Sequence, residues 1–141
     1  SKTIKLIKIL VLSLLSLFSV DSAKAQVTSD DSLSTTISTS DNINFVINKG
    51  DRIGDNLLHS FQEFSIPING SAIFQNDLNI KNIFSRVTGG SLSNIDGLIK
   101  TQGNANLFLI NPSGIIFGQN SRLEINGSFF ATTADSVIFN N

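Results

Sequence analysis

The sequence predicts an all-β fold, a right-handed parallel β-helix (β-solenoid) with short extra β-hairpins or capping strands. Three observations support this prediction. Between residues 104 and 133, short apolar runs alternate with Asn, Gly, Ser and Pro, without the spacing of an amphipathic helix. Strong helix formers are sparse, whereas Ile, Val, Phe, Asn, Ser, Thr and Gly dominate. The 11 Phe residues, with no Tyr or Trp, bring large side chains without polar atoms, and we expect them to line a narrow core.

Residues 1–25 have the features of a signal peptide. Three lysines precede an apolar stretch from Ile9 to Val20, and Ala23-Lys24-Ala25 offers small residues for signal peptidase. A membrane-spanning helix needs roughly 20 apolar residues, so this stretch is short for a span. We therefore expect export through the Sec machinery and cleavage between Ala25 and Gln26. An uncleaved amino-terminal anchor is the alternative.

The rest of the chain divides into a polar segment and a β-rich region. Residues 26–41 are rich in Ser, Thr and Asp, and we expect a polar linker or a first strand there. We expect residues 42–141 to form the β-helix, which ends without a cap and so should continue beyond Asn141. Short β-type runs recur in this region: 43–47, 61–66, 72–74, 80–87, 98–100, 106–110, 115–117, 123–125, 128–131 and 137–139.

The sequence Asn111-Pro112-Ser113-Gly114 predicts a sharp corner. Proline fixes φ and has no N–H, and glycine permits a positive φ, so a strand ending at Ile110 can turn into one starting at Ile115. Asparagines are abundant at the ends of the apolar runs. They tolerate left-handed turn geometry, and when stacked in adjacent coils they can hydrogen-bond to one another's amides.

Charge and cysteine content exclude several classes of partner and fold. Behind the lysine-rich leader acidic residues outnumber basic ones without runs of like charge, so neither nucleic acid nor an anionic membrane is an implied partner. No later stretch is long enough to span a bilayer, so we do not expect an integral membrane protein. The chain has no cysteine, so its stability must come from burial and backbone pairing, and no crosslink would hinder passage through an envelope unfolded.

A β-helix can be an enzyme, but the residues for catalysis are not assembled in this sequence. Polysaccharide lyases and hydrolases of this shape need clustered carboxylates and a basic partner. Outside the polar segment only Asp51 and Asp55 lie close together, with Arg52 between them. His59 is the only histidine, and we favour a structural role for it because a neutral imidazole can satisfy buried polar groups. We therefore assign no catalytic, cofactor-binding or metal-binding residue.

The corner and three further blocks resemble a known family. The segment Asn106-Leu107-Phe108-Leu109-Ile110-Asn111-Pro112-Ser113-Gly114-Ile115 is similar to the Asn-Pro-Asn-Gly-Ile signature of the two-partner secretion domain, with Ser113 in place of the usual asparagine. This is the filamentous-haemagglutinin amino-terminal or haemagglutination activity domain family, here of the cyanobacterial large-exoprotein type. The resemblance extends through residues 56–64, 82–90 and 127–133. The family's other motif, Asn-Pro-Asn-Leu, is absent, and residues 76–79 match it poorly.

The resemblance implies a secretion-targeting module. Such a module crosses the periplasm of a Gram-negative-type envelope, is recognised by the periplasmic transport-associated domains of an outer-membrane barrel transporter, and nucleates β-helix folding at the cell surface. By the family pattern, the secretion determinants are Asn106, Asn111, Pro112, Ser113, Gly114 and Ile115. The secondary blocks contribute His59, Phe61, Phe64, Arg86, Gly89 and Gly90. The alternative function is an adhesive or carbohydrate-binding β-solenoid acting through its own surface, although sugar sites normally use exposed Trp or Tyr.

Overall fold

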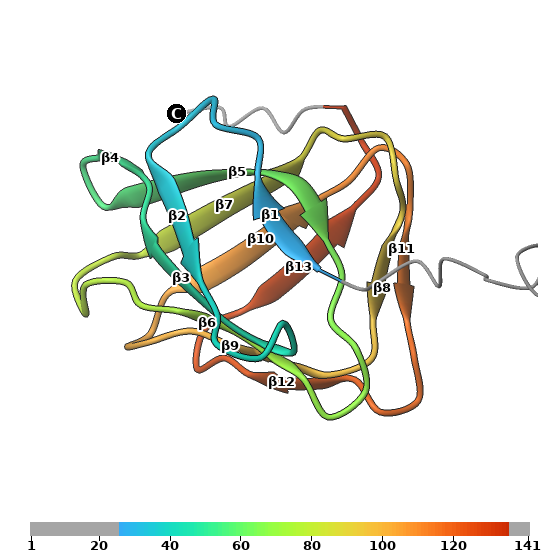
Figure 1. Ribbon diagram of the computed structural model, residues 1–141. Helices are drawn as coiled ribbons and strands as arrows, with labels where there is room; N and C mark the ends of the chain where they lie inside the picture. The colour runs from blue at the N-terminus through green and yellow to red at the C-terminus, as the bar shows by residue number, and fades with distance from the viewer. Residues whose placement is uncertain (1–25, 136–141) are drawn as a thin grey trace, which may run out of the picture.

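The computed structural model describes residues 26–135, and this part of the chain consists of strands, turns and loops (Figure 1). The expected cleavage residue Ala25 and the expected strand at 137–139 lie outside the described residues. The strands are β1 (Val27–Ser29), β2 (Thr35–Ser38), β3 (Asn44–Lys49), β4 (Asp51–Ile53), β5 (Asn56–Phe64), β6 (Ser71–Phe74), β7 (Asn82–Val87), β8 (Ser93–Ile95), β9 (Leu98–Lys100), β10 (Asn106–Ile110), β11 (Ile115–Phe117), β12 (Arg122–Glu124) and β13 (Phe129–Thr132).

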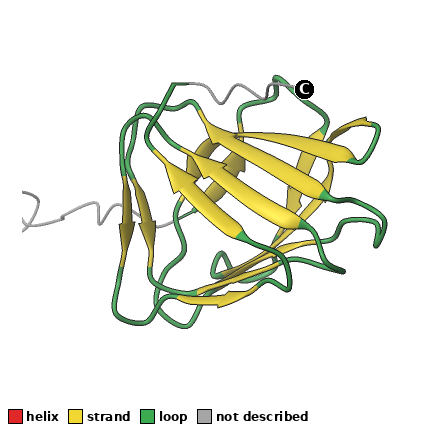
Figure 2. Cartoon of the chain, turned by 180° about the vertical axis from the view of Figure 1, so that it is seen from behind, coloured by secondary structure: helices red, strands yellow, loops and turns green. Residues whose placement is uncertain are grey.

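The strands wind into a coil with three faces. Strands β5, β7, β10 and β13 are parallel neighbours on the first face, and β3, β6, β9 and β12 on the second. Strands β8 and β11 pair in parallel on the third face, which a single bridge between Ile66 and Ile95 extends to the preceding coil. Figure 2 shows the first face from behind, with its strands side by side. The predicted parallel β-helix is therefore confirmed.

Alternate side chains along each strand fill the interior. The register places Leu57, Ile83 and Leu107 opposite one another in successive coils, and all three are buried. Neighbouring residues of a strand point to opposite faces, so an in-register stack builds a continuous apolar column. The first coils contribute four buried phenylalanines, Phe45, Phe61, Phe64 and Phe74, and the rings of the last three are in contact with one another.

The expectation that the phenylalanines line the interior is wrong for one row. Phe84, Phe108 and Phe130 follow Leu58 on the outer side of the first face. Their rings stack with centroids 4.7 Å apart between successive coils. Their strand neighbours, such as Ile83, point inward, so the pleat leaves only the outer side for this row. Ring stacking between coils then recovers contact area outside the core.

The amino-terminal end of the coil is covered by antiparallel strands. Strand β4 pairs with the first half of β5, β1 with its second half, and β2 with β3. A polar linker and a first strand were the alternatives for residues 26–41, and the structure has strands there. We call residues 26–41 the cap. Val27 joins the core and Thr35 is buried. Covering the edges of β3 and β5 in this way protects them from pairing with another chain.

Some strand boundaries differ from those expected from the apolar runs. Strand β5 begins at Asn56 rather than at Phe61, because the buried polar residues His59 and Ser60 interrupt its apolar pattern. Strands β4 and β8 were not expected, since each has only three residues and few apolar ones. Across residues 26–135 no helix is long and apolar enough to cross a membrane.

Candidate functional site

The corner between β10 and β11 is organised by the buried side chain of Asn111. This side chain is 0% exposed, and its Nδ2 donates to the carbonyl of Ser91 and to Oγ of Ser93, both at 3.0 Å. Its Oδ1 accepts from the backbone N–H of Ser113 at 2.9 Å. The backbone N–H of Asn111 donates to the carbonyl of Thr132 in the next coil. Asn111 therefore ties three successive coils together at one corner.

The other residues of this corner divide between the interior and the solvent. Pro112 and Ser113 are exposed at the tip of the turn, whereas Ile115 packs against the core. The turn is closed by the N–H of Gly114, which donates to the carbonyl of Asn111 at 3.0 Å. Gly114 has a φ of 117°, a conformation that side-chain-bearing residues rarely adopt. Within the expected motif, only Pro112 and Ser113 are thus fully presented to a partner.

The Gly89-Gly90 block lies on the preceding coil, directly before the Ser91 carbonyl that Asn111 binds. A Cβ on Gly89 would collide with the backbone carbonyl of Gln62 on β5. Gly89 therefore permits the close approach of two backbone segments. Gly90 has a φ of 87° and forms the turn itself.

Asn106 belongs to a ladder of asparagines on the outer side of the first face. Asn56, Asn82 and Asn106 occupy the same register position in three coils. Nδ2 of Asn82 donates to Oδ1 of Asn56 at 3.0 Å, and Nδ2 of Asn106 donates to Oδ1 of Asn82 at 3.1 Å. The N–H of Ser128 then donates to Oδ1 of Asn106 at 2.8 Å. The ladder fixes the register of four coils with side-chain amides.

His59 is buried in the first coil between Phe61 and Phe74, with ring centroids 6.0 and 5.6 Å away. Its Nδ1 lies 3.1 Å from Oγ1 of Thr35 in the cap, and the same oxygen accepts from the N–H of Ser60 at 3.1 Å. Burial lowers the pKa of His59 to about 4, although the negative charge of Asp51 acts in the opposite direction. His59 therefore joins the cap to β5 as a neutral imidazole.

Arg86 belongs to a polar network that fastens the cap to the coil. Asp30 accepts hydrogen bonds from Oγ of Ser60 and Oγ1 of Thr88, both at 2.6 Å, and from Ser32. Arg86 donates from Nε to Oγ of Ser60 at 2.8 Å and from Nη2 to Oγ of Ser32 at 3.1 Å. Burial raises the pKa of Asp30, but the hydrogen bonds outweigh it and hold the pKa well below its ordinary value. We call these five residues the cap lock.

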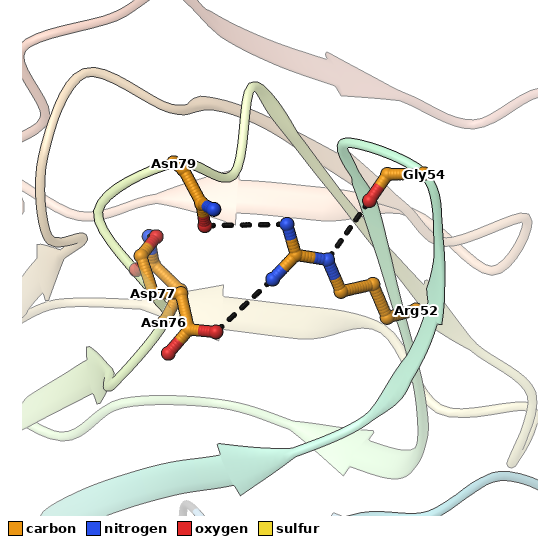
Figure 3. Close-up of polar contacts among 5 residues, drawn as sticks. All are labelled: Arg52, Gly54, Asn76, Asp77 and Asn79. Carbon is orange, nitrogen blue, oxygen red and sulfur yellow. Dashed lines mark hydrogen bonds and ion pairs between the residues drawn. The ribbon is translucent and has the colours of Figure 1, made fainter.

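A second polar cluster joins the β4–β5 hairpin to the loop after β6 (Figure 3). Arg52 donates from Nε to the carbonyl of Gly54 at 2.8 Å, from Nη1 to Asp77 at 3.0 Å and from Nη2 to Oδ1 of Asn79 at 3.2 Å. Arg52 and Asp77 also form an ion pair, with both side chains exposed, and such pairs contribute little stability. The cluster holds the loop that contains residues 76–79 against the hairpin.

The same loop is also bound to the following coil through Asn76. Nδ2 of Asn76 donates to the carbonyl of Gln102 at 2.9 Å, and its Oδ1 accepts from the N–H of Gln102 at 3.0 Å. Asn76 is buried, so it acts like Asn111 at a different corner of the coil. No local sequence pattern marks the cap lock or the Arg52 cluster, because most of their hydrogen bonds join residues 25 to 58 positions apart in the chain.

Within residues 26–135 no three His, Asp or Glu side chains come together in a way that could hold a metal ion. Ser85 lies opposite His59 in the register, and its Oγ is buried without a hydrogen-bond partner in the described part of the chain. Both side chains are buried, so this neighbouring pair contributes to packing. Asp51 binds the N–H of Ser34 at 2.9 Å.

These features define a class of protein: a parallel β-helix with an antiparallel amino-terminal cap and asparagine-bound corners. The model of the TPS secretion domain matches residues 25–141. The chain therefore belongs to the TPS secretion domain family, which implies that it is part of a secreted exoprotein.

Solved structures agree with this assignment at the level of the fold. Seven chains match, among them the crystal structure of the filamentous hemagglutinin secretion domain, with a TM-score of 0.67 and 23% sequence identity. The match covers 81% of this chain and 44% of that one, so the chain spans less than half the length of that structure. A comparison with curated proteins gave no match.

Proposed function

We propose that this chain directs its exoprotein to an outer-membrane barrel transporter, whose periplasmic transport-associated domains bind it, and that it nucleates β-helix folding at the cell surface. The family match over residues 25–141 carries this proposal. A transporter domain can bind a partly folded β-helix by adding a strand to an open edge.

The covered amino-terminal edges of the coil support directional folding. The edges of β3 and β5 are covered by the cap, whereas β11, β12 and β13 each pair with one neighbour within residues 26–135. Phe117 and Leu123 lie opposite the buried Ile95 and Ile99 in the register, yet they are 43% and 46% exposed. Each new coil added at this end would bury such side chains, and stepwise burial would favour outward movement of the chain.

The motif residues support this function in two ways. Asn106 and Asn111 hold successive coils in register and act through folding. Pro112 and Ser113 are exposed, so they are the residues of the motif that a transporter can contact directly. We propose that Gly114 and Ile115 serve the shape of the corner that presents them.

Coexpression with an outer-membrane barrel transporter that exports the exoprotein tests this proposal. We expect the chain to reach the cell surface or the medium only when the transporter is present. Export of equal amounts without the transporter would refute the targeting function. Replacing Ser113 with Ala tests direct contact at the corner, since this exposed side chain can change without disturbing the coil; an unchanged export rate would exclude recognition through the Ser113 side chain.

A further inference from the structure

One edge of β5 pairs with β7, and the other edge is covered by two separate short strands. Strand β5 has nine residues, and β4 pairs with Asn56 to Leu58 at its start. Strand β1 pairs with the stretch from Phe61 to Phe64, at the end of β5 that is farther from the β4–β5 hairpin (Figure 1). Strand β1 has only three residues, and its register shifts between Thr28 and Ser29. A short, irregular strand of this kind holds an edge weakly by backbone pairing alone.

Side chains of the cap lock strengthen the attachment of β1. Asp30 follows β1 directly and accepts from Ser60 on β5 and from Thr88, which follows β7. Arg86 on β7 donates to Ser60 and to Ser32 of the cap. Two of the three side chains that Asp30 and Ser32 bind in the coil, those of Thr88 and Arg86, thus belong to the second coil rather than to the first. Hydrogen bonds to a carboxylate are stronger than those between neutral groups, so these contacts carry much of the attachment.

This arrangement sets an order of events during folding. Arg86 lies 54 residues after Ser32, and Thr88 lies 58 residues after Asp30. The cap lock is therefore incomplete until β7 has been laid down on β5. Until that point β1 is held by its short pairing and by contacts within the first coil, such as the hydrogen bond from Ser60 to Asp30, and it lacks the bonds from Arg86 and Thr88. The edge of β5 from Phe61 to Phe64 is then covered less firmly than in the complete fold.

We propose that this edge of β5 is the docking edge for a β-strand of the transporter's periplasmic domain, and that β1 replaces that strand once Arg86 and Thr88 complete the cap lock. The proposal rests on the proposed secretion function. The occupant is an antiparallel strand, because β1 occupies the edge in that direction. It carries an apolar residue opposite Phe64, because Val27 fills that position and is buried. Strand addition to an exposed edge is a common mode of peptide recognition.

A disulfide between β1 and β5 tests the exchange. Thr28 and Glu63 are directly opposite each other in the antiparallel pair, where Cα atoms are about 4.5–5.5 Å apart, within the range that a disulfide spans. The chain has no cysteine of its own, so the Thr28→Cys/Glu63→Cys variant forms a single defined crosslink. Its affinity for the purified periplasmic domains of a transporter that exports the chain is measured with and without reductant. We expect at least a tenfold loss of affinity in the oxidised form and recovery on reduction.

The matched control crosslinks the other cap strand. Thr36 and Asn48 are paired between β2 and β3, so the Thr36→Cys/Asn48→Cys variant fixes the cap without covering the edge of β5. It should bind equally well in both redox states. The Thr88→Val variant loses one hydroxyl of the cap lock, and we expect its affinity to rise about tenfold because the open form becomes more populated.

The outcomes separate this inference from the function on which it rests. Binding that is insensitive to the β1–β5 crosslink, in a chain that the transporter exports, would overturn the inference and leave the secretion function intact. The inference would also be overturned if the transporter exports the chain but its periplasmic domains bind neither the reduced β1–β5 variant nor Thr88→Val. Export that does not require the transporter would refute the secretion function itself.

Discussion

Mild acid should destabilise the folded chain through His59 alone. This side chain is 2% exposed, and its Nδ1 lies 3.1 Å from the hydroxyl oxygen of Thr35. Burial lowers its pKa from 6.5 to about 4, with Asp51 opposing this shift. The unfolded chain therefore takes up a proton before the folded chain does as the pH falls. The stability that a neutral His59 contributes is complete above a pH of 6.5 and is lost as the pH falls toward 4.

The expected loss follows from the two pKa values. Between about pH 7.5 and about pH 5.0, proton linkage at His59 lowers the free energy of unfolding by about 2 kcal/mol. Asp30, Asp41 and Asp51 do not obscure this effect, because their pKa values lie below the ordinary value of 3.8. They are charged in both states at about pH 5.0, and their contribution is lost only in stronger acid.

Urea unfolding of the wild type and of His59→Gln at both pH values measures the effect. We expect the variant to be less stable at neutral pH, since it loses the imidazole between Phe61 and Phe74, but to lose almost nothing further at about pH 5.0. The wild type should lose about 2 kcal/mol over the same interval. Equal losses in both proteins would assign the acid sensitivity to other groups. No loss in the wild type would show that His59 is not held neutral by its surroundings.

Three further predictions concern the corners and the ladder, each measured by urea unfolding. Asn111→Ala should lower the free energy of unfolding by about 3 kcal/mol, because it leaves buried hydrogen-bond partners unsatisfied. Ser113→Asn should change the same free energy by less than about 0.5 kcal/mol. Equal effects would refute the division of this corner into buried and exposed residues. Asn82→Ala should cost about 1–2 kcal/mol, since it removes two ladder bonds, and a neutral result would mean that the ladder is dispensable. Gly89→Ala should lower the free energy of unfolding by about 3 kcal/mol, and by more than Gly90→Ala, because only the first substitution creates a clash with backbone. The reverse order would contradict the close approach of Gly89 to the backbone of Gln62.

The fold class could be predicted because β-helix corners leave a local signature. Runs such as Asn106 to Ile110 followed by Asn-Pro-Ser-Gly contain both the strand and its turn within ten residues, and no other part of the chain is needed to interpret them. The stacking of asparagines was also predictable in kind, since Asn recurs at the starts of strands. Which asparagines meet was not, because the register between Asn82 and Asn106 depends on the length of the whole coil between them.

The polar attachments of the cap could not be predicted. The sequence left a polar linker and a first strand open for residues 26–41, because Asp30, Ser32 and Thr35 bind partners on β5, on β7 and directly after β7, which lie 25 to 58 residues away. The outward phenylalanines escaped prediction for a related reason. Phe84 follows the equally apolar Ile83, and only the pairing with β5 decides which of the two points inward.

Transport of an unrelated passenger tests the central claim most directly. A passenger protein that is normally confined to the periplasm would be fused after Asn141. Its amount outside the cell would be measured with and without an outer-membrane barrel transporter that exports the exoprotein. If this chain is a secretion-targeting module, the passenger should appear outside only when both the chain and the transporter are present. A passenger that stays in the periplasm with both present, while the exoprotein itself is exported, would show that the targeting information lies elsewhere.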